Sequence, residues 1–375
     1  MPRKRCRRLR NFSLRPVAMK TTVPIIDLNN EAMPKKSIVT GVLSYGMSGR
    51  VFHAPFINEK TRFELRAVVE RHEKRAQQRY PNIISYDSVN DLLNDDAIEL
   101  VIINTPNNTH VDYATQALEA GKHILVEKPF APSSEEAKKI FDLGRKVGKH
   151  VMVFQNRRWD SDFKLLKRVV ERQSVGEPIE LHVRFDRYRP EKGPKVFKEQ
   201  PIPASGVLYD LGPHLLDQAI CLFGKPKKSI KILATHREGS EVDDFSTLVL
   251  SYPKGLTVFI HASLLVANPL PAYVLHGTKG SFQKVRADVQ EDQLQAGILP
   301  KDPEYGIEPP GKEGLITLMK PNGDREIRYR EALKGDYNDL FNAVYAQIRR
   351  DEPFPVKEEE IRWQLEILEQ QVWND

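Results

Sequence analysis

The feature that most constrains the fold is an alternation of short apolar strands with helical stretches, which begins at residue 37. The strands are nearly continuous apolar runs, and the helix from Ser133 to Gly148 opens with a capping box, Ser133 and Glu136. Such strands are typical of a parallel sheet covered by helices on both faces. The sequence therefore predicts a doubly wound α/β domain over residues 37–155, with strands at Ile38–Leu43, Phe63–Val69, Ile98–Asn104, His123–Glu127 and Val151–Phe154.

The second half of the chain, residues 156–375, has a different pattern. Glu180–Tyr188 alternates apolar and polar residues, and Phe245–Tyr252 and Leu256–Ser263 are joined by a turn with Pro253 and Gly255. Long strands and tight turns predict an α/β domain with a large mixed or antiparallel sheet that is open on one face. The helical period predicts helices over Asp336–Arg350 and Glu358–Trp373, and the Pro-, Gly- and acid-rich segment Asp288–Gly314 is expected to be a surface loop or a lid.

The net charge of +6 comes from the N-terminus, because residues 1–20 hold eight basic side chains and no acidic one. We therefore expect residues 1–36 to be a disordered basic extension, and we expect neither nucleic acid nor a membrane as a partner. A tail that contacts RNA or phosphate headgroups is the alternative. The two cysteines, Cys6 and Cys221, form no disulfide framework, and no apolar run approaches the roughly 18 residues of a membrane span. These features predict a cytoplasmic protein.

A glycine-rich loop follows the first strand and opens a helix. A glycine-rich loop in this position allows its backbone to approach a pyrophosphate, which the helix N-terminus then attracts. An ordinary strand–helix turn is the alternative. The expected dinucleotide-binding residues of this loop are Ser44, Tyr45, Gly46, Met47, Ser48 and Gly49.

The second strand ends at Glu70, and Arg71 follows it. An acidic residue about 20 residues after the glycines can accept hydrogen bonds from the ribose hydroxyls of NAD, whereas an arginine there can hold the 2′-phosphate of NADP. The two could also form a solvated charge pair. The sequence leaves the cofactor open between NAD and NADP.

Two further strand ends carry polar side chains at the edge where an open α/β sheet binds its ligands. Lys128 lies where a cation could bind a substrate hydroxyl and stabilise the alkoxide as hydride leaves. A surface lysine is the alternative for Lys128, and a capping or packing role is the alternative for His110. The expected cofactor-binding residues at these ends are Asn104, Thr105, Pro106, Asn107, His110 and Glu127.

Polar residues also follow the last strand of the first domain, where a cleft between domains can open. Asn156, Arg157 and Trp159 suit a hydroxyl-rich ligand there, although a polar linker would have the same composition. Further on, Asp210 and His214 are four residues apart, and a helix would place them on one face. His214 can take a proton from an alcohol near neutral pH while Asp210 orients it or binds a hydroxyl.

Two points around His214 stay open. Pro213 is either the first residue of a helix or lies inside one that begins near Ser205. A structural histidine is the alternative to a catalytic one, and no metal ion is expected at this site.

Together these motifs resemble the Gfo/Idh/MocA oxidoreductases, from about Ile38 to the C-terminus. The resemblance rests on Ser44–Gly49, Asn104–His110, residues 120–123, Glu127-Lys128-Pro129 and Asp210–His214, and residues 51–55, 156–163 and 208–224 are similar to the NADP-dependent scyllo-inositol dehydrogenase subgroup. It implies an N-terminal Rossmann domain, a cis Pro129 and an open sheet that carries the substrate and often a dimer contact. It also implies that Lys128 and His214 are the catalytic lysine and histidine, with Asp210 as their partner. The expected substrate-binding residues are in all Lys128, Asn156, Arg157, Trp159, Asp210, His214 and Tyr273.

The expected activity is therefore transfer of hydride between a secondary alcohol of a sugar or cyclitol and NAD or NADP, by a homodimer or homotetramer. A non-catalytic cofactor-binding sensor and an NAD-retaining glycosidase are the alternatives. Two residues depart from the family pattern. Ser44 replaces the first glycine of the loop, and Ala272 stands where the inositol-dehydrogenase-like subgroup often has an arginine, so specificity for a polyol does not follow.

Overall fold

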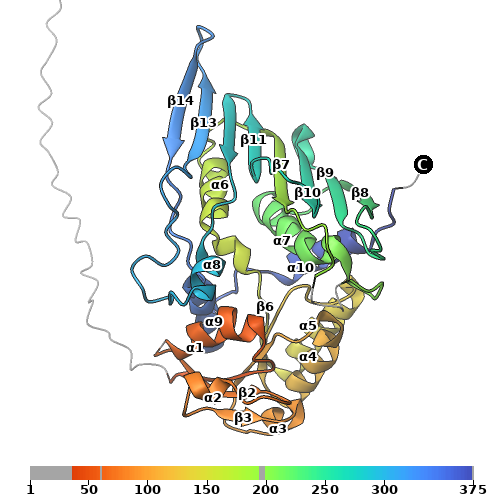
Figure 1. Cartoon of the computed structure of the whole chain (residues 1–375), viewed down its shortest axis with the longest axis vertical. Helices are drawn as coiled ribbons and strands as arrows, with labels where there is room; N and C mark the ends of the chain where they lie inside the picture. Colours follow the sequence, from red (N-terminus) through yellow and green to blue (C-terminus); the bar gives the residue numbers. More distant parts are fainter. Residues whose placement is uncertain (1–35, 60, 194–198, 374–375) are drawn as a thin grey trace, which may run out of the picture. The chain divides into compact units, whose positions relative to one another are not determined.

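The apolar strands of the first half pair in parallel, in the order β3-β2-β1-β4-β5-β6, which is the strand order of a Rossmann domain (Figure 1). The computed structural model describes residues 36–59, 61–193 and 199–373, so the expected extension lies outside these ranges except for Lys36. The six strands are β1 (Ile38–Val42), β2 (Phe63–Val69), β3 (Ile84–Tyr86), β4 (Leu100–Ile103), β5 (His123–Val126) and β6 (Val151–Val153).

Helices join these strands, because the chain must cross back from the end of one parallel strand to the start of the next. The helix α5 begins after Ser133, whose hydroxyl accepts the N–H of Glu136, and it ends at Gly148 in the left-handed conformation. Both ends agree with the sequence prediction. The connecting elements are η1 (Gly49–His53), α1 (Ala54–Asn58), α2 (Ala76–Arg79), α3 (Val89–Leu93), η2 (Asn107–Thr109), α4 (His110–Glu119) and α5 (Ser134–Val147).

The second half forms a mixed sheet of eight strands in the order β14-β13-β12-β11-β7-β10-β9-β8, in which only β7 and β10 pair in parallel. This confirms the predicted fold class. The strands are β7 (Pro178–Asp186), β8 (Lys228–Ala234), β9 (Phe245–Ser251), β10 (Thr257–Ser263), β11 (Tyr273–Gly277), β12 (Gly280–Lys284), β13 (Gly314–Met319) and β14 (Arg325–Arg330). The remaining elements are η3 (Asn156–Trp159), α6 (Ser161–Glu171), α7 (Gly206–Phe223), η5 (Pro253–Gly255), α8 (Gln290–Gln295), α9 (Asn338–Arg350) and α10 (Glu358–Glu369).

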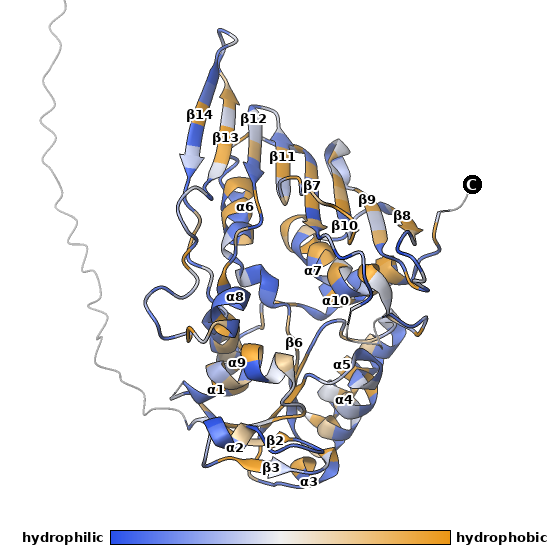
Figure 2. Ribbon diagram, in the orientation of Figure 1, coloured by the Kyte–Doolittle hydropathy of each residue, from blue (hydrophilic) through white to orange (hydrophobic). Residues whose placement is uncertain are grey.

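One face of this second sheet is covered by helices. α6 packs on β12, and α7 packs on β7, β9 and β10 (Figure 1). On β7 the inward residues Leu181, Val183 and Phe185 are buried, and the residues between them are partly exposed. Figure 2 shows that the outermost strand β14 is mostly hydrophilic, as its exposed side chains require. None of the helices in the described ranges is long and apolar enough to cross a membrane.

Two expectations about local structure are decided here. α7 begins at Gly206 and continues through Pro213, so the proline lies inside a helix that begins near Ser205 and is not its first residue. The segment Asp288–Gly314 is a surface loop with many exposed residues, and buried side chains anchor it. It contains α8, and its fully buried residues Gln290 and Tyr305 hydrogen-bond to each other at 2.8 Å.

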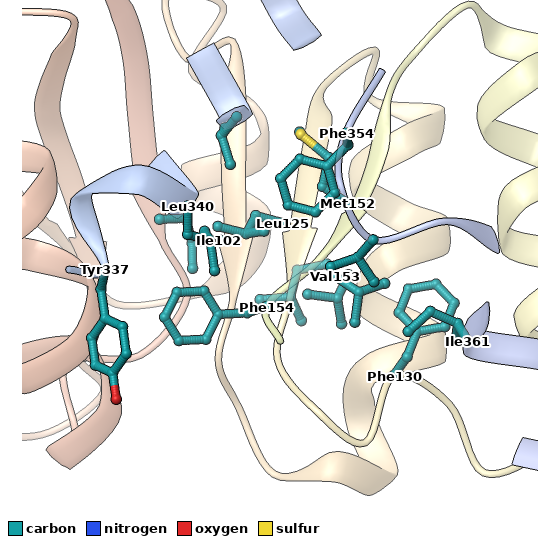
Figure 3. Packing of buried hydrophobic residues seen from close by; sticks show 14 of the residues in the cluster. Ile102, Leu125, Phe130, Met152, Val153, Phe154, Tyr337, Leu340, Phe354 and Ile361 are labelled. Carbon is teal, nitrogen blue, oxygen red and sulfur yellow. The ribbon is translucent and has the colours of Figure 1, made fainter. Parts of the chain in front are cut away.

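The end of the chain returns to the first domain. Phe341 of α9 stacks on Phe56 of α1, with ring centroids 5.2 Å apart. Figure 3 shows Leu340, Phe354 and Ile361 from the C-terminal segments packed near residues of β4, β5 and β6. α9 therefore packs against the core of the Rossmann domain, although it follows the second sheet in the sequence.

Candidate active site

The glycine-rich loop is fixed by an amide from a neighbouring strand end. Asn104, which follows β4, accepts the backbone N–H of Ser44 at 3.0 Å and donates to its carbonyl oxygen at 2.8 Å. A Cβ on Gly49 would collide with that carbonyl and lie 3.1 Å from Nδ2 of Asn104, so only glycine fits there. Ser44, which departs from the family pattern, closes the turn with its own hydroxyl by accepting the N–H of Gly46 at 3.2 Å.

The turn that follows the loop is held by Glu127. This η1 segment is a π-helical turn, a rare form that is often found at functional sites. Oε1 of Glu127 accepts the hydroxyl of Ser48 at 2.7 Å and lies 3.0 Å from Nε2 of His53. Burial alone would raise the pKa of Glu127, but the hydrogen bond and charge of His53, the Ser48 hydroxyl and the charge of Lys128 together lower it. Glu127 is thus an anion that positions the loop.

The carboxylate of Glu70, the predicted ribose ligand, already accepts hydrogen bonds from the protein itself. Its carboxylate accepts the N–H groups of Arg75 and Ala76 at 2.9 and 3.2 Å and the hydroxyl of Ser85 at 2.7 Å, and the residue is buried. Arg71 next to it is exposed and donates to the hydroxyl of Tyr113 at 3.1 Å. At this strand end the Arg71 side chain is therefore more accessible than that of Glu70.

The residues after β4 form a tight turn that connects both halves of the chain. Thr105 and Thr109 share a hydrogen bond of 2.7 Å between their hydroxyls, and Pro106 precedes η2. Asn107 donates to the carbonyl of Ala204, just before α7, at 2.6 Å. His110 is buried, with its ring nitrogens 2.8 Å from the carbonyl of Pro129 and 3.0 Å from that of Thr105. These contacts place His110 in the packing role that the sequence left open.

Lys128 lies in the first domain and contacts α7 of the second domain. It follows β5, and the peptide bond to Pro129 is cis, as the family resemblance implies. Its Nζ donates to the backbone carbonyl of Asp210 at 2.7 Å and lies 3.7 Å from the carboxylate Oδ1 of the same residue. His214 lies one helical turn further along α7. The fold therefore brings together the predicted catalytic residues Lys128, Asp210 and His214 from both halves of the chain.

The environment of His214 keeps its ring neutral. The side chain is buried, and its Nδ1 makes no hydrogen bond within the described ranges. Burial lowers the pKa of His214 well below 6.5, and the positive charges of Lys128, Arg157, Arg286 and Arg187 lower it further. A neutral imidazole can accept a proton, as a general base must.

Of the other predicted substrate residues, Arg157 is the one whose charge acts on His214. Arg157 pairs with Asp160 at 3.1 Å and with Glu291 of α8 at 3.0 Å. Asn156 is buried, and the carbonyl of Trp159 accepts an amide N–H from Gln290. These three residues belong to η3, which links the two domains.

Tyr273 is placed differently from the expectation. It is fully buried on β11, and its hydroxyl donates to Oε1 of Gln218 at 3.1 Å. In this structure the side chain of Tyr273 is not accessible to a substrate. Its position under α7 makes it a support for the helix that carries His214.

Comparisons with known proteins decide the family. The model described as "Oxidoreductase family, NAD-binding Rossmann fold" matches residues 38–155, and the GFO/IDH/MocA C-terminal domain matches residues 163–283. The uncharacterized oxidoreductase YdgJ of Escherichia coli is 35% identical over 89% of this chain and 95% of its own length. The chain belongs to the Gfo/Idh/MocA oxidoreductases.

Two other members extend the comparison. The scyllo-inositol 2-dehydrogenase (NADP(+)) IolW of Bacillus subtilis is 32% identical over 86% of this chain and 90% of its own length. The solved structure of the oxidoreductase yvaA from the same species has a TM-score of 0.84 and 31% identity, and covers 89% of this chain and 94% of its own. As a Gfo/Idh/MocA oxidoreductase, this chain has an NAD-binding Rossmann fold.

Sequence reasoning missed three groups in this Gfo/Idh/MocA site. Arg187 directly follows β7, and Arg286 follows β12 by two residues, so the signal in the sequence is their position at strand ends. For His53, nothing near it in the sequence indicates its contact with Glu127.

Proposed function

We propose that this oxidoreductase transfers hydride from a secondary alcohol of a sugar or cyclitol to NADP. The observation that carries the proposal is the meeting of Lys128 and His214 across the domains, with Lys128 Nζ 2.7 Å from the carbonyl of Asp210, one helical turn before His214. A cation beside a neutral imidazole suits the removal of a proton from an alcohol.

The residues around the first sheet fit a dinucleotide. Gly49 and the bonds from Asn104 hold the loop against the strand end. Among the described residues, and apart from the chain neighbours of Gly46, only the hydroxyl of Ser44 comes within 4 Å of a Cβ at Gly46, which leaves room for a phosphate to approach the backbone. The loop residues 44–49 would hold the pyrophosphate, and Asn104, Thr105 and Asn107 would line the way to Lys128. When bound, the cofactor supplies the acceptor for the hydride.

Lys128 and His214 would carry out the proton transfer. Lys128 donates a hydrogen bond to the alcohol oxygen and stabilises its negative charge as the C–H bond breaks. The hydroxyl proton passes to the imidazole of His214, and the carbon becomes a carbonyl. Asp210 holds Lys128 through its backbone carbonyl, and its carboxylate, 3.7 Å from the same Nζ, can accept a second substrate hydroxyl.

NADP is favoured over NAD by the state of Glu70 and Arg71. The carboxylate of Glu70 is occupied by two backbone N–H groups and a serine hydroxyl, whereas the guanidinium of Arg71 is exposed. An exposed arginine at this strand end suits a 2′-phosphate. The relative IolW is named as an NADP(+) enzyme.

Replacing Lys128 tests the catalytic assignment. We expect Lys128→Ala to lower kcat about 100- to 1000-fold, because the alkoxide loses its cation, while NADP binding stays within about threefold of the wild type. Lys146→Ala, at an exposed position of α5, is the matched control and should behave as the wild type. Loss of NADP binding in Lys128→Ala would contradict this role, and tight cofactor binding without net reduction would favour the sensor or the glycosidase.

We also propose a homodimer or homotetramer that uses the face of the second sheet away from α6 and α7. That face carries His182 stacked on Phe259 at 4.8 Å, and Ile179 and Ile230 are exposed elsewhere on the strands. Exposed apolar and aromatic side chains that lie together on a sheet often mark an interface. Light scattering should give a multiple of the chain mass, and Phe259→Glu should lower it. A monomeric wild type would contradict the proposal.

A further inference from the structure

The proposed base His214 lies in an excess of positive charge. The four charged groups that act on it most strongly are all cations, Lys128, Arg157, Arg187 and Arg286, and they come from four different segments of the chain. Two of the four have clear partners. Lys128 bonds to Asp210, and Arg157 pairs with Asp160 and Glu291.

The other two, Arg187 and Arg286, are held by an aromatic ring. The guanidinium of Arg286 lies 4.1 Å from the ring centroid of Phe185, and that of Arg187 lies 4.6 Å from it. Phe185 is buried at the end of β7. Arg157 lies 5.3 Å from the same ring centroid, so three guanidinium groups surround Phe185, and a contact with a ring positions a guanidinium without using its N–H groups.

Their hydrogen-bonding capacity is largely unused. Arg286 donates from Nη2 to the carbonyl of Arg184 at 2.9 Å, but its Nε and Nη1 are buried and make no hydrogen bond in the described part of the chain. The nearest carboxylate, Asp162, is 4.0 Å from Nη1 and instead accepts the N–H of Ala287 at 3.0 Å. For Arg187, no side-chain hydrogen bond or ion pair is found among residues 36–59, 61–193 and 199–373.

Both side chains are half-buried, and their donors are only partly used within the described residues, so these two cations are placed to bind an anion. Burial, followed by the charge of Arg189, lowers the pKa of Arg187 to about 10, against a smaller opposing effect of Asp210. The cofactor's phosphates are expected elsewhere, at the glycine-rich loop and at Arg71 in the first domain. The anion that fits here must therefore belong to the substrate.

We propose that the substrate carries an anionic group, a carboxylate or a phosphate ester, near the alcohol that is oxidised, and that Arg187 and Arg286 bind it. This inference rests on the proposed function and specifies its substrate class as acidic sugars or cyclitols. A bound anion would also offset the positive charge around His214, and would thereby make it a stronger base when the correct substrate is present.

Matched pairs of neutral and anionic compounds test the inference. The NADP-loaded protein would be given D-glucose against D-glucuronate for a carboxylate, and myo-inositol against myo-inositol 1-phosphate for a phosphate ester. Calorimetry measures binding, and reduced nicotinamide measures turnover. We expect at least one anionic member to bind more than about 10-fold tighter than its neutral partner, since hydrogen bonds to a charged group are stronger than those between neutral groups. Which pair shows the preference distinguishes the carboxylate from the phosphate.

The variants Arg187→Gln and Arg286→Gln identify the groups responsible. Each should raise KM or Kd for the preferred anionic compound about 10- to 100-fold and leave the neutral partner within about threefold. Arg172→Gln, exposed at the end of α6, is the matched control for charge and should change neither. NADP affinity and the thermal unfolding curve verify that the variants remain folded.

The outcomes separate the two proposals. The anionic substrate class would be overturned if the neutral compounds bind and react as well as the anionic ones or better. It would also be overturned if the arginine variants lose the same affinity for both members of a pair. Neither result would contradict the proposed dehydrogenase activity. Binding of the anions without turnover of any compound would support the arginine site and overturn the proposed function. Binding of none of the four compounds by the NADP-loaded protein would overturn the inference.

Discussion

At the scale of single residues, the site depends on side chains that hold backbone in place. Asn104 makes two hydrogen bonds to Ser44, and Glu127 holds Ser48 and His53. Asn104 and Glu127 can both affect cofactor binding without contacting a substrate. The loop and the strand end that they fix are where the cofactor is proposed to lie.

Removing the amide of Asn104 should loosen the glycine-rich loop. We expect Asn104→Ala to weaken NADP binding about 10-fold or more, because two hydrogen bonds to the backbone of Ser44 are lost. Asn108→Ala, an exposed position in the following turn, is the control. Fluorescence titration with NADP measures both. An Asn104→Ala protein that binds NADP as the wild type does would show that the loop is held by other contacts.

The pKa of His214 predicts where activity falls at low pH. Because burial and the cations lower this pKa well below 6.5, the base stays neutral, and kcat/KM should decline only as the pH falls below 6.5. The charged groups around it are Lys128, Arg157, Arg187 and Arg286, with Asp210 on its own helix. Arg187→Gln removes one cation and should move the decline to higher pH. A wild-type decline centred at or above 6.5 would contradict this account.

At the scale of elements, α7 is the central support of the site, since it carries both Asp210 and His214. Its first turn is capped by Asp243, which precedes β9. The carboxylate of Asp243 accepts the N–H of Leu208 at 2.7 Å, and its carbonyl accepts that of Val207 at 2.8 Å. Gly206 at the start of the helix has a φ of +81° and packs against this carboxyl group, so a side chain would not fit.

The Asp243 carboxyl group predicts a pH dependence of stability. Burial raises its pKa from 3.8 to about 6, against the hydrogen bond from Leu208, so the folded protein binds this proton more tightly than the unfolded chain. The contribution to stability is therefore lost as the pH rises from about 4 to 6. The side chain of Asp243→Asn does not titrate, so this variant does not lose stability over that pH range. Its amide oxygen can still accept the N–H of Leu208.

The measurement for this prediction is Tm against pH. The Tm of Asp243→Asn relative to the wild type should rise between pH 4 and 6 and then remain constant. Asp292→Asn, on the exposed side of α8, should show no such trend. A constant difference for Asp243→Asn at every pH would mean that the carboxyl group has its ordinary pKa in the folded protein.

At the scale of the whole molecule, the parts that the sequence predicts best are those in which the signal is local. The strand–helix alternation, the caps of α5 and the glycine-rich loop each lie within a short stretch, and the structure confirms the predicted fold class. Lys128 can also be predicted locally, because it follows a strand and precedes a proline.

The sequence could not predict contacts that the fold makes between distant segments. The occupation of Glu70 by Ser85, the burial of Tyr273 under α7 and the return of α9 to the first domain all depend on tertiary packing. Arg187 and Arg286 are almost 100 residues apart and meet only on the ring of Phe185. Their common environment appears only when the second sheet is assembled.

The central claim is that this chain oxidises an alcohol with a nicotinamide cofactor. The most direct measurement is the absorbance of reduced nicotinamide after purified protein is mixed with NADP or NAD and a panel of cyclitols, sugars and sugar acids. The account predicts reduced NADP, with little or no reduction of NAD, and loss of the signal in Lys128→Ala. Cofactor binding with no reduction of either cofactor by any compound, in the same protein, would contradict it.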